Sequence, residues 1–122
     1  MITGIKHVTI CVKDQDRALD FYTNMLGFEL LIDAPMGEGK QRWIELKIPN
    51  SDTQVVLFTP EGHEDRIGTN SNIIFTTKDV EKTYRELSNR GVNFTKAPAS
   101  EPWGTYALFQ DTEGNSFCLS SS

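Results

Sequence analysis

Residues suited to acid–base, nucleophilic or metal-binding chemistry are few in this chain. It has two histidines, His7 and His63, and two cysteines, Cys11 and Cys118. An imidazole titrates near neutral pH, so His7 is a candidate metal ligand, general base or hydrogen-bonding group, with a purely structural histidine as the alternative. His63 lies among acidic residues in a polar stretch, which is typical of a solvated loop. His7 is therefore the histidine most suited to a site.

The cysteines and one glutamate extend the set of candidates. A thiolate nucleophile needs a nearby cation or histidine, so the simpler interpretation makes Cys11 and Cys118 small apolar residues of a pocket wall. Glu45 alternates with Ile44 and Leu46 in a strand-like run. If its face of the strand is enclosed, Glu45 is a candidate catalytic base or a partner for His7; at the rim of a sheet it is merely solvated.

Aromatic residues favour a ligand site. Trp43, Phe58, Trp103, Tyr106 and Phe109 lie on predicted strands and loops that would rim a cavity. An aromatic lining with few polar groups suits a planar or partly apolar small molecule. Phe58 and Phe109 have an alternative place in the core beneath the helices. Trp103, in a Pro-Trp-Gly turn, is the hardest of the five to explain as core.

Predicted strands and helices must position these side chains. An alternating β-branched run over 5–12 predicts a strand. Asp14–Asp16 then predict the start of an amphipathic helix, which ends at Gly27. Strand-like runs follow at 28–32, 43–48 and 54–59. In the second half we predict a strand at 72–77, a helix from Asp79 to about Arg90 that ends at Gly91, and strands at 92–96, 106–110 and 116–120.

The two halves form an internal repeat. Segment 7–14 matches segment 72–79, both ending in Lys-Asp before a helix, and Gly27 corresponds to Gly91. Each half reads β-α-β-β-β. We therefore predict one domain over 1–122, with a first repeat over 1–59, a connector over 60–70 and a second repeat over 71–122.

The repeat predicts an α+β fold in which two tandem β-α-β-β-β modules form a curved, cup-like mixed sheet with the helices outside. Val8, Ile10, Ile73 and Phe75 are expected to face the helices. The opposite strand faces are expected to line a cavity across a pseudo-twofold axis, which is a natural small-molecule site.

Composition excludes several classes of protein. The chain has 122 residues and a net charge of −5, which disfavours nucleic acid and anionic membranes as partners. No apolar run approaches the roughly 18 residues that a membrane span needs. The N-terminus lacks the features of a secretory signal, and two cysteines form no disulfide framework. We expect a cytoplasmic protein with free thiols.

Three segments carry a family resemblance: GIKHVTICVKDQDRALDFYTNMLGFEL, NIIFTTKDVEKTYRELSNRGV and DTEGNSFCL. They resemble the vicinal-oxygen-chelate superfamily, which contains glyoxalase I, extradiol dioxygenases, fosfomycin-resistance proteins and bleomycin-binding proteins. Its commonest signatures correspond to F-Y-x-x-x-L-G-F at Phe21–Phe28 and D-x-x-G-N at Asp111–Asn115. Members with these signatures differ widely in activity.

The resemblance implies four inward-facing positions that hold a divalent metal in metal-using members. They fall at His7, at Leu57 (with Val56 or Phe58 as one-residue alternatives), at Asn72 and at Cys118. Leucine cannot ligate, asparagine is a weak donor, and cysteine suits softer metals than those usual in the superfamily. A closed site needs three or four donors. The chain thus departs from the metal-binding pattern.

We therefore predict a small-molecule-binding protein that resembles the bleomycin-resistance branch and has no cofactor. Its ligand would stack on Trp43, Trp103 and Tyr106, contact His7 and Asn72, and meet Leu57 and Cys118 in the wall. The alternative is a lyase or dioxygenase with a divalent metal at His7 and Glu45 as base. Whether the chain is an enzyme stays open, and a cup that serves a protein partner is a third possibility. The resemblance also implies a homodimer.

Overall fold

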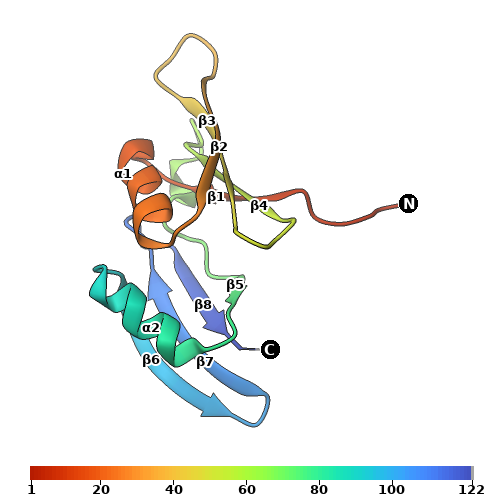
Figure 1. Cartoon of the computed structure of the whole chain (residues 1–122). Helices are drawn as coiled ribbons and strands as arrows, with labels where there is room; N and C mark the ends of the chain where they lie inside the picture. Colours follow the sequence, from red (N-terminus) through yellow and green to blue (C-terminus); the bar gives the residue numbers. More distant parts are fainter. Residues whose placement is uncertain (122) are drawn as a thin grey trace. The chain divides into compact units, whose positions relative to one another are not determined.

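The computed structural model describes residues 1–121, and the chain divides into two compact units, Met1–Ile67 and the part from Gly68 onward. We call them unit 1 and unit 2. Each contains one four-stranded mixed sheet and one main helix (Figure 1). The predicted α+β class and the tandem repeat are confirmed.

Unit 1 contains β1 (His7–Cys11), α1 (Gln15–Asp20), the π-helical turn η1 (Phe21–Met25), β2 (Glu29–Pro35), β3 (Arg42–Lys47), β4 (Gln54–Phe58) and the 3₁₀ turn η2 (Glu64–Arg66). Its strand order is β1-β4-β3-β2. β1 runs parallel to β4, whereas the β4–β3 and β3–β2 pairs are antiparallel.

Unit 2 repeats this arrangement with β5 (Ile73–Thr76), α2 (Val80–Asn89), β6 (Asn93–Glu101), β7 (Gly104–Gln110) and β8 (Ser116–Ser120). Its strand order, β5-β8-β7-β6, is that of unit 1 element for element. β5 is parallel to β8 and the other two pairs are antiparallel.

The repeated Lys-Asp pair has a structural role at the start of each helix. The Asp14 carboxylate accepts a hydrogen bond from the Arg17 backbone N–H at 3.0 Å, and Asp79 accepts one from Lys82 at 3.0 Å. Each aspartate thus satisfies one of the free donors of the first turn. Helix termination is repeated too, because Gly27 and Gly91 adopt φ of +82° and +100°, which favour glycine.

The first helix differs from its predicted form. Its second part is a π-helical turn, closed by the hydrogen bond from Leu26 N–H to the Phe21 carbonyl at 3.1 Å. Phe21 and the adjacent Tyr22 are both buried, with their ring centroids 5.1 Å apart. The amphipathic pattern predicted the buried side but not this wider turn, which a periodicity near 3.6 does not reveal.

Each sheet buries one face beneath its helix. In unit 1, Ile10, Leu57 and Ile44 are neighbours across three strands and are fully buried. In unit 2, the Phe109 ring contacts Phe75, Phe94 and Phe117. Phe109 thus takes the alternative place in the core and not the rim of a cavity, whereas Phe58 is half-buried beside Trp43.

A buried glutamine joins α1 to the sheet of unit 1. The Gln15 side-chain amide donates to the carbonyls of Arg42 (2.7 Å) and Leu57 (3.1 Å), and its oxygen accepts from the Arg42 backbone N–H at 3.0 Å. These bonds satisfy backbone groups of β3 and β4 under the helix. Gln15 is therefore a structural residue.

Replacement of Gln15 by alanine should lower the free energy of unfolding by about 2 kcal/mol, because buried backbone groups lose their partners. Urea denaturation followed by circular dichroism measures this. Asp16→Ala is the matched control: its carboxylate lies 2.6 Å from the Arg42 guanidinium but is 83% exposed, so the loss should stay below about 1 kcal/mol. Equal losses in the two variants would contradict the role given to Gln15.

Candidate functional site

Strand alternation assigns side chains to the face of the unit 1 sheet away from α1, which we call open face 1. Ile44 and Leu46 are buried on the helix side, so Trp43 and Glu45 project from the other side of β3. The same register gives open face 1 the side chains of His7, Thr9 and Cys11 from β1, and Val56 and Phe58 from β4.

Trp43 is at the centre of a group of rings on open face 1. Its ring centroid lies 6.0 Å from that of His7, with an interplanar angle of 72°, and 6.3 Å from that of Phe58, with an angle of 68°. Both contacts are edge-to-face, a favourable geometry for rings. The three side chains come from three different strands and are all half-buried. They form a cluster of three aromatic rings that is partly accessible to solvent.

Glu45 gives this aromatic group a fixed polar side. The Trp43 indole N–H donates to Glu45 Oε1 at 2.8 Å. Within residues 1–121 this is the only hydrogen bond of the Glu45 carboxylate, and the His7 imidazole makes none. A carboxylate oxygen and two ring nitrogens are thus left to bind donors or acceptors of a ligand. The structure brings together three of the predicted site residues: His7, Trp43 and Glu45.

The strand register shows which residue of β4 occupies the second of the four positions that the family resemblance implies. Leu57 is fully buried, lies between Ile10 and Ile44, and faces α1 rather than the side of His7. Val56, one of the two alternatives, pairs with Thr9 exactly as Cys118 of unit 2 pairs with Ile74. Val56 therefore occupies the position on β4 that is equivalent to Cys118 on β8.

Unit 2 has a corresponding open face, the side of its sheet away from α2, which we call open face 2. One row of neighbours crosses all four strands: Ile74, Cys118, Leu108 and Lys96. Ile74 is 64% exposed. Burial raises the pKa of the Cys118 thiol, which keeps it protonated at neutral pH and disfavours a nucleophilic role. Asn72 is exposed just before β5.

Two predicted aromatic residues meet on unit 2. Trp103 stacks on Tyr106 with centroids 5.5 Å apart and an interplanar angle of 30°. Trp103 lies in the tight turn between β6 and β7, where Glu101 pairs with Gly104, and it is 61% exposed. The backbone of Gly104 packs against Ser121, since a Cβ on it would lie 3.0 Å from the Ser121 carbonyl oxygen. The turn therefore holds the solvent-exposed indole of Trp103 beside the phenol ring of Tyr106.

Lys96 is a residue of open face 2 that the sequence did not indicate as a candidate. Its ammonium lies 5.5 Å from the centroid of the Tyr106 ring. The Arg42 guanidinium of unit 1 pairs with Asp33 (3.0 Å) and Asp16, and these contacts raise its pKa. His63 is exposed beside η2, as expected of a loop residue.

The residues around His7 do not match a closed metal centre. Open face 1 carries His7, Cys11 and Glu45, and Glu45 already accepts the Trp43 indole hydrogen. Among residues 1–121, no three His, Cys, Asp or Glu side chains gather closely enough to hold a metal ion. A divalent centre needs three or four donors.

The described part of the chain also contains no helix long and apolar enough to cross a membrane.

Comparison with known proteins adds to this geometry. The model of the Glyoxalase/Bleomycin resistance protein/Dioxygenase superfamily matches residues 4–119. YetH, an uncharacterised protein of Bacillus subtilis (strain 168), is 32% identical over 98% of both chains. The crystal structure of TnmS3, described as an antibiotic binding protein from Streptomyces sp. CB03234, is 32% identical and covers 98% of this chain and 96% of its own, with a TM-score of 0.83.

A second solved structure is closer in sequence. It is a superfamily member from Sphaerobacter thermophilus DSM 20745, 37% identical over 99% of this chain and 98% of its own, with a TM-score of 0.86. These similarities extend over both units of the chain.

Proposed function

The chain belongs to the Glyoxalase/Bleomycin resistance protein/Dioxygenase superfamily, and on that premise we propose that it binds a small organic molecule by aromatic stacking, without a complete metal site. The observation that carries the proposal is the Trp43 group on open face 1. Trp43 contacts both His7 and Phe58 and donates to Glu45, so an accessible aromatic surface lies beside unsatisfied polar groups. This is the usual composition of a small-molecule site.

Each residue has a distinct role in this proposal. The Trp43 ring provides a flat apolar surface, and the free Glu45 oxygen accepts a hydrogen bond from a hydroxyl or amine of the ligand. The His7 imidazole donates or accepts one, according to its tautomer. On unit 2, Trp103 and Tyr106 provide a second stacking surface with Cys118 in its wall, while Asn72, before β5 at the other end of this sheet, offers a separate polar contact. The antibiotic-binding relative TnmS3 supports this class of ligand.

Trp43→Ala should weaken the binding of a planar aromatic probe, 2-naphthamide, by about tenfold, because an aromatic ring at the centre of an interface carries much of its binding energy. The measurement is a ligand-observed NMR titration in protein that also carries Trp103→Ala, so that unit 2 has no indole to contribute. Trp43→Phe is the matched control, since it keeps a smaller aromatic ring while losing the bond to Glu45. Unchanged affinity in Trp43→Ala would refute a ligand site on open face 1.

A metal-dependent lyase or dioxygenase is the competing function. It is favoured by one observation, that His7 and Glu45 share a face and the imidazole has no hydrogen bond within residues 1–121. Elemental analysis of the purified protein separates the two functions. One tightly held divalent metal per chain, lost in His7→Ala, would overturn the binding proposal. Finally, we propose that the protein is a homodimer and that it is cytoplasmic. Sedimentation of the purified chain tests the homodimer, and fractionation of the cells that produce it tests the location.

A further inference from the structure

Lys96 faces open face 2 because β6 contains a bulge. Phe94 pairs with Phe109 and packs on Tyr84 of α2, with ring centroids 4.7 Å apart, so its side chain lies on the helix side. In a regular strand Lys96, two residues later, would point the same way. The register shifts between Phe94 and Lys96, so that Lys96 pairs with Leu108, the neighbour of Phe109. A bulge of this kind redirects a side chain.

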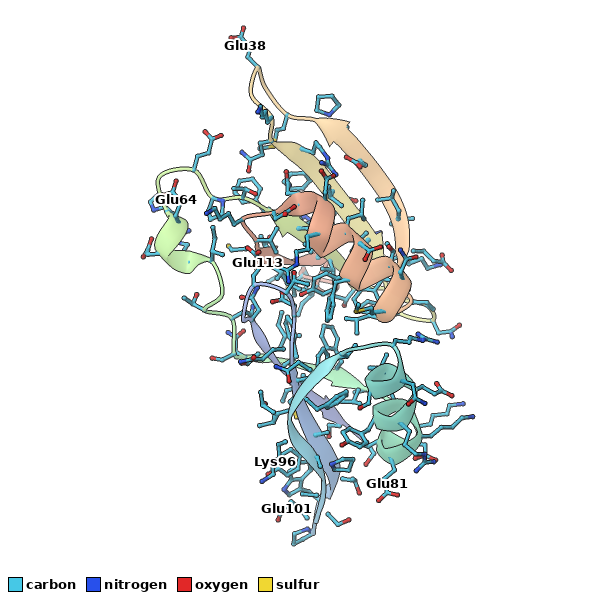
Figure 2. All side chains as sticks on the ribbon, turned by 90° about the vertical axis from the view of Figure 1, so that its left-hand side faces the viewer. Glu38, Glu64, Glu81, Lys96, Glu101 and Glu113 are labelled. Carbon is cyan, nitrogen blue, oxygen red and sulfur yellow. The ribbon has the colours of Figure 1, made fainter. Side chains whose placement is uncertain are left out.

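The redirected lysine ends an apolar row. Ile74, Cys118 and Leu108 are neighbours on successive strands, and Lys96 is the fourth member on the edge strand β6. Adjacent strands are about 4.8 Å apart, so the row has the dimensions of a two- or three-ring aromatic molecule. Figure 2 shows Lys96 on β6 and Glu81 on α2, on the other side of the sheet.

The next row contains the stacking surface. Tyr106 pairs with Ser120 on one side and with Ala99 on the other, and Trp103 stacks on its ring. The Lys96 ammonium lies over the same phenol ring. Within residues 1–121 it has no carboxylate at ion-pair distance, although the chain carries a net charge of −5. A free cation thus lies beside an exposed aromatic stack.

We propose that this surface on unit 2, formed by Trp103, Tyr106, Lys96 and the row from Ile74 to Leu108, selects a planar aromatic ligand that carries an acidic group. The ring system stacks on Trp103 and Tyr106, and a carboxylate or phenolate pairs with the Lys96 ammonium. The aromatic contacts contribute most of the affinity, while the lysine selects the charge. This inference rests on the proposed binding function and adds the charge of the ligand to it.

Two probes of the same shape test the selection. 2-Naphthoate and 2-naphthamide share one ring system and differ in charge. In Trp43→Phe protein, Trp103 is the remaining tryptophan of the chain, so an NMR titration of its indole N–H reports on this surface. We expect the naphthoate to bind about three- to fivefold more tightly than the amide, the range of a partly exposed ion pair, and this preference should shrink at high salt.

Variants at Lys96 decide whether the lysine causes the preference for the naphthoate. Lys96→Gln should bind both probes with the affinity of the amide, whereas Lys96→Arg should keep the preference. Equal binding of the two probes by the Lys96-containing protein, or a preference that persists in Lys96→Gln, would overturn the charge selection and leave aromatic binding intact. If neither probe shifts the Trp103 signal, unit 2 has no stacking site, and both this inference and the part of the proposed function assigned to unit 2 are refuted.

Discussion

Replacing Phe109 by alanine is expected to lower the free energy of unfolding by about 3–5 kcal/mol. Phe109 is 1% exposed, and its ring lies 5.5 Å from both Phe94 and Phe117 and 6.2 Å from Phe75, measured between centroids. Its removal opens a cavity beneath α2 that neighbouring rings cannot fill without leaving their own contacts. Because these rings come from every strand of unit 2, the whole sheet is weakened.

Urea denaturation followed by circular dichroism and by one-dimensional NMR measures this loss. Leu108→Ala is the matched control, because Leu108 is the preceding residue of β7 and faces the other way, where it is only half-buried. It should cost about 1–2 kcal/mol. If the two variants lose the same stability, the two faces of β7 do not differ as the core of unit 2 requires.

The second large effect is expected at Asn115, for which alanine should cost about 2–4 kcal/mol. Its side chain is fully buried, accepts a hydrogen bond from the Asn70 backbone N–H at 3.0 Å, and donates one to Asp111 Oδ2 at 2.9 Å. Alanine leaves the Asn70 N–H without this partner and removes a donor from the Asp111 carboxylate. Buried polar groups that lose partners cost their full desolvation energy.

Thermal and urea unfolding of Asn115→Ala test this expectation, with Asn93→Ala as the control. Asn93 is exposed, and its side chain makes a 3.3 Å hydrogen bond to Gln110 at the surface, so its loss should cost less than about 0.5 kcal/mol. A cost at Asn115 no greater than at Asn93 would mean that the turn from Asp111 to Asn115 does not anchor the chain at Asn70. The D-x-x-G-N signature would then lack the structural role that these bonds give it.

The sequence predicted the elements of the fold because they depend on local signals. Aspartates before each helix, glycines after it and β-branched runs each act over a few residues, and their recurrence revealed the repeat. For Phe109 the sequence left the cavity rim and the core as alternatives, and the residue lies in the core. The π-helical turn after α1 was not predicted, since two buried aromatics in sequence fit an ordinary amphipathic helix equally well.

The candidate site was predictable only in part, because it depends on which face each strand residue occupies. Trp43, Glu45 and His7 lie in strands whose sequence alternates, so every second residue can be assigned to the open face. β4 is apolar from Val55 to Phe58, so alternation cannot distinguish Leu57 from Val56 there. The partners of Arg42 are distant in sequence, and Lys96 faces open face 2 only through a bulge. Where these side chains lie is determined by pairing between different strands and helices, which local sequence patterns do not reveal.

The bulge in β6 also affects how this surface responds to mutation. Substitution of Lys96 alters only the group that it presents, while Phe94 and Phe109 keep the core intact. Loss of Thr95, the extra residue of the bulge, would leave Lys96 opposite Leu108 in a regular strand, with the lysine still on open face 2. A regular β6 of the same length would instead place Lys96 opposite Ala107, toward the helix side. The charge displayed by unit 2 therefore depends on how β6 pairs with β7 as well as on the residue at position 96.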